Sequence, residues 1–376
     1  MLAKSKISRI IYAFGATIAV VVGFLLGGFG QGLEHWSTDL QIAYFSARRT
    51  EQYPRIAVVT VSDATLKNYP YTSPVDRQLI GNLVDRLDAA GAKIIGLDFV
   101  FDRPTEPAKD QSLIESIRNA KAKIVLSALD GRTPLPQRNQ EFQTEFLARA
   151  GRPVGHSYFE ENHNLLVPSD RVIRLLALPS PAYPEHRSFA EMLAAADGHD
   201  ARPSAPYIAW LLPPKNNSET FMTLLAEQVL DQSADAVHLP PNIFRDRIVL
   251  VGGDFPDRDQ HLTPLSITNS QRYSGISIHA QILAQLLDRR SIGPPALPLQ
   301  LLILVIAACG GIWVGRRDPR GRYLFWIRSV GALGLIIVAT VAFTFFGLIF
   351  PISLTLLFLL AGTTFGYHSG SPFLRK

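Results

Sequence analysis

Acidic residues follow several apolar runs in this sequence, and carboxylates grouped at such positions can bind a cation or a cationic ligand. Each of five aspartates lies at or just beyond the end of a run rich in Val, Ile and Leu: Asp63, Asp98, Asp102, Asp130 and Asp254. Aspartate is also common as a helix N-cap and in turns, so a purely local structural role is the alternative. The sequence therefore predicts a set of acidic ligand-binding candidates and leaves both roles open.

The densest polar stretch, residues 252–264, contains three further ligand-binding candidates: Asp259, His261 and Thr263. The two glycines at its start permit close approach of the backbone to a ligand. Asp259 and His261 are two positions apart and can form an orienting hydrogen-bonded pair. The acids do not follow the alternate spacing of a calcium-binding loop. A ligand-binding loop and a loop that only anchors the chain both fit this stretch.

Motifs that would mark an enzyme or a metalloprotein are absent from the sequence. It has no phosphate-binding lysine loop and no G-x-S-x-G nucleophile turn. The single cysteine, Cys309, lies in an apolar run, which excludes an intrachain disulfide. His156, Glu160 and His163 do not have the zincin spacing. We therefore expect no catalytic residues, no cofactor and no bound metal, with an unfamiliar hydrolase as an alternative.

The candidate residues lie in a segment where apolar strands alternate with amphipathic helices. Buried strands are predicted from β-branched runs at residues 55–63, 93–101, 123–129 and 247–253. Helices are predicted after the cap at Ser73-Pro74, at about 110–120 and at 276–289. This alternation is typical of a mostly parallel sheet with flanking helices, an α/β fold, whose carboxyl edge collects ligands.

The middle of this segment is less regular than its two ends. Residues 153–160 and 165–172 are predicted to form an antiparallel addition to the sheet. Residues 188–196 and 219–231 are predicted to be helical.

Long runs without charged side chains predict four membrane spans. Residues 10–30 and 296–315 are each long enough to cross a hydrocarbon core of about 30 Å, and the first has no clear cleavage site, so we expect an uncleaved anchor. The last apolar tract is twice as long as a bilayer is thick, so it must turn, and Gly347 to Pro351 is the natural break. This break predicts spans at about 327–347 and 350–368. The predicted organisation is an anchor over 1–30, an extracytoplasmic domain over 31–295 and three spans with a short tail over 296–376.

Basic residues cluster beside the predicted spans. They are Lys4, Lys6 and Arg9; Arg316, Arg317, Arg320, Arg322 and Arg328; and Arg375 and Lys376. The positive-inside rule places these clusters, and with them both termini, in the cytoplasm, and the large domain on the other side of the plasma membrane. The rest of the chain has 27 basic against 31 acidic residues, although the whole chain carries a net charge of +5. We therefore expect no nucleic-acid partner.

Five stretches together resemble CHASE2 domains, the extracytoplasmic sensory domains of bacterial transmembrane receptors. They are residues 59–66, 87–101, 247–253, 259–264 and 274–280. In this order the five stretches cover nearly the whole predicted external domain. The predicted layout, with one membrane span before this domain and three after it, is similar to that of the family. The resemblance implies a sensor of an unidentified ligand or envelope signal in the inner membrane of a bacterium.

The chain departs from the family pattern in two places. Tyr69-Pro70-Tyr71 stands where the first block of the family usually has Trp and Pro. About eight residues follow the last predicted span, so we expect no output domain there, and signalling through a separate membrane partner or by homo-oligomerisation. Three functions stay open: a sensor of a small ligand or periplasmic protein, a non-signalling scaffold of an envelope complex, and a periplasmic enzyme.

Overall fold

The computed structural model forms two units, an α/β unit and a helical unit. The described residues are 28–67, 69–161, 170–177, 179, 185–199, 202–203, 205–216, 218–230, 239–257, 259–317 and 324–370. The α/β unit comprises Ala47–Glu161 and Arg171–Ser291. Helix α2 (Gly28–Phe45) groups with the C-terminal helices that follow Ile292. The predicted domain limits at residues 31 and 295 stay predictions.

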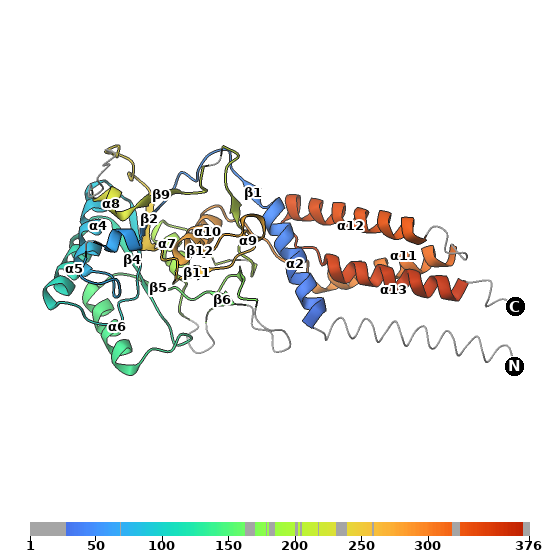
Figure 1. The fold of residues 1–376 in the computed structure, drawn as a ribbon, viewed down its shortest axis with the longest axis horizontal. Coiled ribbons are helices and arrows are strands. Elements are labelled where there is room, and N and C mark those ends of the chain that lie inside the picture. The colour runs from blue at the N-terminus through green and yellow to red at the C-terminus, as the bar shows by residue number, and fades with distance from the viewer. Residues whose placement is uncertain are drawn as a thin grey trace. The chain divides into compact units, whose positions relative to one another are not determined.

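A six-stranded parallel sheet forms the centre of the α/β unit (Figure 1). Its strands are β2 (Ile56–Val61), β3 (Ile94–Asp98), β4 (Lys123–Ala128), β5 (Val154–His156), β9 (Met222–Leu225) and β10 (Ile248–Gly253). The spatial order is β5-β4-β3-β10-β2-β9, so the late strand β10 lies between the first two. Every residue of β2 and β10 is buried, which explains their uninterrupted apolar sequences. The predicted α/β fold with a parallel sheet is confirmed.

Helices cover both faces of this sheet (Figure 1). One face carries α4 (Arg77–Ala89), α5 (Pro107–Asn119), α6 (Gln137–Ala150) and the short α8 (Ala226–Val229). The other face carries α7 (Phe189–Ala196) and α10 (Gly275–Leu287). A Cβ atom added at Gly252 of β10 would lie 2.9 Å from the Cβ of Ile276. Glycine at this position therefore lets α10 pack closely on the central strand.

Short elements complete the α/β unit. They are β1 (Ala47–Arg48) with β8 (Leu211–Leu212), β6 (Glu160–Glu161) with β7 (Ile173–Leu175), β11 (Gln260–His261) with β12 (Tyr273–Ser274), α3 (Asp63–Leu66) and α9 (Ser266–Asn269). The β6–β7 and β11–β12 pairs are antiparallel. The β11–β12 pair fixes the loop that follows β10 beside the start of α10.

Three local predictions were wrong. Strand β5 extends the main sheet in parallel, although residues 153–160 were expected to pair antiparallel, and most of 165–172 lies outside the described residues. Residues 222–225 form edge strand β9 where a helix was expected, because pairing with β2 overrides a weak helical pattern. Helix α4 is capped by Asp76, whose Oδ1 accepts hydrogen bonds from the amides of Gln78 and Leu79, and not by Ser73.

The helical unit contains α11 (Leu297–Arg317), α12 (Leu324–Phe346) and α13 (Ile352–Gly370). Within the described part of the chain, two helical stretches are long and apolar enough to cross a membrane, Leu297–Arg317 and Arg328–Phe346. The apolar stretch of α13, Ile352–Tyr367, is shorter. The predicted break is confirmed, since α12 ends before Gly347. The first predicted span lies almost wholly outside the described residues, so the total of four spans stays a prediction.

Glycines bring α11 and α13 into direct backbone contact. A Cβ atom added at Gly311 or Gly315 would lie 2.5 or 2.2 Å from a backbone oxygen of α13. Gly362 and Gly366 of α13 face the backbone of α11 in the same way, at 2.4 and 2.2 Å. Such small-residue pairs, four positions apart, allow close packing of apolar helices. Gly310, by contrast, has no atom within 4 Å of such a Cβ.

Candidate functional site

Asp98 is a buried carboxylate at the carboxyl end of β3. Its side chain is 11% exposed, because α10 and the loop after β10 cover the end of the strand. Burial, and then the charge of Asp259, raise the pKa of Asp98 to about 7, against the opposing effect of a hydrogen bond with Ser127 of β4. Asp98 therefore changes its charge close to neutral pH.

His279 of α10 faces Asp98 and was not predicted from the sequence. Its side chain is 2% exposed, and its Nε2 lies 3.9 Å from Oδ2 of Asp98, too far for a hydrogen bond. Neither ring nitrogen has a hydrogen-bond partner among the described residues. The ring packs against Phe159 and Phe189, at centroid distances of 4.6 and 5.2 Å. Burial, and then the charge of His261, lower the pKa of His279 to about 3, so its ring is neutral at physiological pH.

Asp259 and His261 form the predicted hydrogen-bonded pair in the loop after β10. His261 Nε2 lies 3.0 Å from Oδ1 of Asp259. Asp259 has a φ of 55°, a left-handed conformation that aspartate adopts more readily than most residues. A Cβ atom added at Gly275 would lie 2.7 Å from Oδ1 of Asp259, so glycine at the start of α10 leaves room for the carboxylate.

These four side chains line one cavity of about 290 Å³, here called the Asp98 cavity. The other lining residues are Val100, Leu129, Thr133, Ser157, Tyr158, Phe159 and Ile173. The cavity lies beyond the carboxyl ends of β3 and β10, next to the point where the strand order reverses, which is the usual ligand position in an open parallel sheet. Two carboxylates and aromatic rings suit a small cation with N–H donors.

A second cavity adjoins the Asp98 cavity and is more apolar. It measures about 360 Å³ and shares Tyr158 and His279 with its neighbour. Leu176, Pro206 and Ile282 contribute to its apolar wall. A ligand whose cationic end lies at Asp98 can therefore place an apolar group beside it.

The other predicted candidates lie outside the Asp98 cavity. Asp63 is an exposed first residue of α3, and exposed Asp254 accepts a hydrogen bond from Gln260. Thr263 is buried, and its amide donates to Oγ of Ser266 at the start of α9. This geometry fits the loop-anchor alternative that the sequence left open, and a ligand-binding role of Thr263 stays a prediction.

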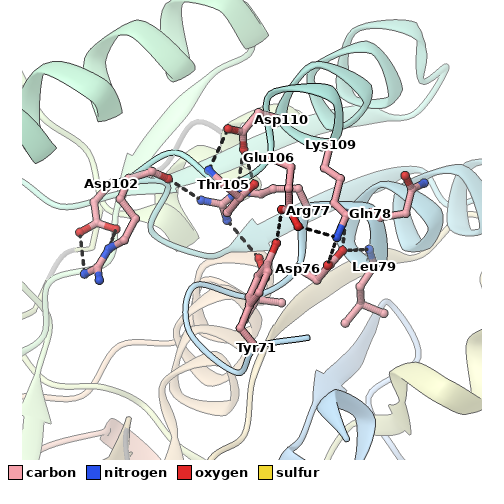
Figure 2. A network of polar contacts seen from close by, with 12 residues as sticks. Tyr71, Asp76, Arg77, Gln78, Leu79, Asp102, Thr105, Glu106, Lys109 and Asp110 are labelled. Atoms are coloured by element: carbon pink, nitrogen blue, oxygen red, sulfur yellow. Dashed lines mark hydrogen bonds and ion pairs between the residues drawn. The ribbon is translucent and has the colours of Figure 1, made fainter. Parts of the chain in front are cut away.

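Asp102 belongs to a separate polar network on the α4 and α5 side of the sheet (Figure 2). Burial opposes its charge, yet hydrogen bonds from Arg103 and Asn139 lower the pKa of Asp102 overall. At the centre of the network, the Arg77 side chain is 1% exposed and its Nε donates to Oδ1 of Asp110 at 3.3 Å (Figure 2). The Arg77 guanidinium also lies 4.7 Å from the ring centroid of Phe101. This network links α4 to α5, and a ligand-binding role of Asp102 stays a prediction.

Sequence reasoning missed His279 because it saw α10 only as an apolar helix. The periodic apolar residues of this helix mark its buried face, and His279 lies on that face with them. The available signal in the sequence was a histidine on an otherwise apolar helix face. This helix follows the strand that ends in two glycines, with the short elements β11, α9 and β12 between them. What placed it opposite Asp98 is the insertion of β10 between β2 and β3, which no local pattern predicts.

Comparison with known proteins identifies the family of this chain. The CHASE2 domain model matches residues 16–313, which is most of the chain and includes the whole α/β unit. Searches of curated proteins and of solved structures found no match. CHASE2 domains are extracytoplasmic sensory domains. With the family model covering both β10 and the helix that carries His279, the chain belongs to the CHASE2 domain family.

Proposed function

We propose that this protein is a membrane-anchored sensor whose α/β unit binds a small cationic ligand in the Asp98 cavity. The observation that carries the proposal is the pair of buried ring nitrogens of His279, which have no hydrogen-bond partner among the residues that the structure describes, beside the buried carboxylate of Asp98. Buried polar groups without partners are costly, and a site that keeps them gains most from a ligand that supplies the missing hydrogen bonds.

The ligand chemistry follows from the charges that line the cavity. Asp98 and Asp259 accept hydrogen bonds and favour a positive charge, and neutral His279 offers one donor and one acceptor. Tyr158 and Phe159 add aromatic rings to the cavity wall, and aromatic rings attract cations, as the Arg132 guanidinium 4.2 Å from the Tyr158 ring centroid illustrates. A small primary or quaternary amine, with an apolar group reaching into the second cavity, combines these features.

The route for a signal is the chain connection between α10 and α11. His279 lies on α10, and residues 288–296 join this helix directly to α11, which is long and apolar enough to cross a membrane. A ligand that binds one arrangement of α10 more tightly than another shifts the population between them. The glycine contacts between α11 and α13 leave little room for intermediate arrangements, which suits two discrete packings. A separate membrane protein or a second copy of the chain then receives the change.

The proposed membrane orientation places the α/β unit outside the cytoplasm and both termini inside it. The basic residues that precede residue 10 and follow α11 support this arrangement. A bacterial plasma membrane is the corresponding location. Reporter fusions at residue 150 and at residue 376 test it, because a cytoplasmic signal at residue 150 contradicts the proposed orientation.

A polar cavity favours ligand binding over the scaffold alternative, which requires a flat apolar patch instead. The enzyme alternative requires a nucleophile or acid–base pair within hydrogen-bond reach. Asp98 and His279 stand 3.9 Å apart, so Asp259 and His261, 3.0 Å apart, are the pair that such an enzyme would use.

Thermal-shift screening of the full-length protein in detergent tests the proposal. The panel contains small amines, quaternary ammonium compounds and divalent cations, applied to the parent, Asp98→Asn and Asp259→Asn. A compound that stabilises the parent but neither variant supports the site. Asp63→Asn is the matched control, because this aspartate is exposed and lies outside the cavity, and it keeps the parental response. If the two cavity variants respond as the parent does, the Asp98 cavity is not the binding site.

A further inference from the structure

Three metal-ligating side chains meet at the carboxyl ends of β4 and β5. One ligand atom from each of Asp130, His156 and His186 lies within 4.8 Å of the other two. The imidazoles of His156 and His186 stack, with ring centroids 4.2 Å apart and planes inclined by 13°. Zinc binds nitrogen and carboxylate oxygen at about 2.0–2.2 Å, and an imidazole nitrogen bonds in the plane of its ring, so the two rings must rotate out of the stack to hold one ion together with Asp130.

The backbone holds the two histidines side by side. The amide of His156 donates to the carbonyl oxygen of Arg187 at 2.9 Å, so the segment before α7 runs along β5. Gly155 permits this approach, because a Cβ atom there would lie 2.5 Å from the Cα of Phe189. The Ser188 N-cap of α7 fixes the other end of the segment. The stacked pair is therefore set by close backbone packing and not by flexible side chains alone.

The side chain of Asp130, the third member of the cluster, is held in place by hydrogen bonds within its own turn. Its side chain is fully buried, and the amide of Arg132 donates to its Oδ1 at 3.0 Å. The Arg132 guanidinium donates to both carboxylate oxygens, at 2.5–3.1 Å. Three N–H groups make these bonds, because the Nε–H is shared between both oxygens, so they leave one of the roughly four acceptor positions of the carboxylate for an ion. Hydrogen-bonded carboxylates of this kind are usual behind metal ligands.

His156 supplies an independent indication of a missing partner. Its Nδ1 is buried and has no hydrogen-bond partner in the part of the chain that the structure describes. A buried imidazole nitrogen in that position is costly, and a metal ion satisfies it as a hydrogen-bond donor does.

We infer that Asp130, His156 and His186 form a binding site for a divalent transition-metal ion of the zinc type. Two imidazoles with one carboxylate suit zinc, copper, nickel or iron, whereas calcium and magnesium require more oxygen ligands. Three protein ligands leave a further position for solvent or an exogenous ligand. The inference goes beyond the proposed sensor and does not depend on it, because none of these three residues is among those that line the Asp98 cavity. The sequence suggested only His156 with Glu160 and His163, because His186 lies far along the chain.

Cobalt titration of the full-length protein tests this site. The protein is purified in detergent with a histidine-free affinity tag, stripped with a chelator and titrated with Co²⁺, whose visible absorption reports nitrogen and oxygen ligands. We expect one Co²⁺ per chain, displaced by an equivalent of Zn²⁺. Absence of a stoichiometric absorption change in the parent overturns the inference.

Variants locate the ion. His156→Ala and His186→Ala each lower the affinity by more than the roughly 10- to 100-fold that outer-shell changes cost. His199→Ala is the matched control, because His199 is partly buried but pairs with Asp197 at 3.2 Å, and it binds as the parent does. Equal affinity in the parent and both ligand variants contradicts the site.

X-ray absorption of the zinc-loaded parent keeps the test valid if a variant does not fold. The inference requires a first shell of nitrogen and oxygen with the multiple scattering of two imidazoles. A shell with one imidazole, or with none, overturns it.

Discussion

Replacing Asp98 by asparagine removes a pH-dependent cost that burial imposes on the folded protein. The pKa of Asp98 is about 7 in the folded chain, against an ordinary value of 3.8 for an aspartate in water. The folded state therefore holds this proton more tightly than the unfolded state does. Its contribution to stability is complete below about pH 4, declines as the pH rises and is fully lost above about pH 7. Asparagine resembles the protonated carboxyl group and has no such dependence.

The size of the effect follows from the two pKa values. A difference of about 3 between them corresponds to about 4 kcal/mol in all. Roughly 2.5 kcal/mol of this falls between pH 5 and pH 8, by the same linkage relation. Asp98→Asn should therefore gain about that much stability relative to the parent as the pH is raised over this interval. Asp259, His261 and His279 surround Asp98 and are present in both proteins, so the difference isolates the titration of Asp98.

Denaturant unfolding of the full-length protein in detergent, followed by circular dichroism at pH 5 and pH 8, measures this difference. Asp63→Asn serves as the control, because this exposed side chain is outside the cavity, and its stability relative to the parent should be the same at both pH values. If Asp98→Asn also differs from the parent by the same amount at pH 5 and pH 8, the reasoning about burial at this site is refuted.

Two further predictions concern packing. Arg77→Leu leaves the buried carboxylate of Asp110 without its ion pair and should destabilise the α/β unit by about 3–5 kcal/mol in denaturant unfolding. The control Arg118→Leu changes an exposed side chain and should alter the free energy of unfolding by less than about 0.5 kcal/mol. If Arg77→Leu destabilises the protein no more than Arg118→Leu does, the network is dispensable. Gly311→Leu should separate α11 from α13 and abolish a disulfide engineered between the two helices. The control Gly310→Leu places its side chain in open space and should leave that cross-link intact. Formation of the cross-link in both variants would contradict the observed helix packing.

Much of the fold could be predicted from sequence because the central strands are buried on both faces. The uninterrupted apolar runs at β2 and β10 indicate such strands, and their carboxyl ends indicate where ligands bind. Edge strand β9 was missed because none of its residues is buried and only pairing with β2 makes them a strand. Local sequence carries no information on such pairing.

The candidate site was only partly predictable for a related reason. Asp98 was expected at a strand end and Asp259 with His261 in the polar loop of residues 252–264, and the structure brings these three side chains to one cavity. Asp63 and Asp254 follow neighbouring strands, yet both point into solvent, because the length of a loop decides which side chains return over the sheet. His279 required knowledge of which helix covers β3.

Calorimetric titration of the amine that gives the largest thermal shift, at pH 6 and pH 8, tests the sensor site most directly. If the ligand binds only the ionised form of Asp98, a pKa of about 7 makes the ionised fraction, and with it the apparent affinity, roughly tenfold greater at pH 8 than at pH 6. Asp98→Asn should bind weakly and equally at both pH values. An affinity that is the same in the parent and Asp98→Asn at both pH values would contradict the account.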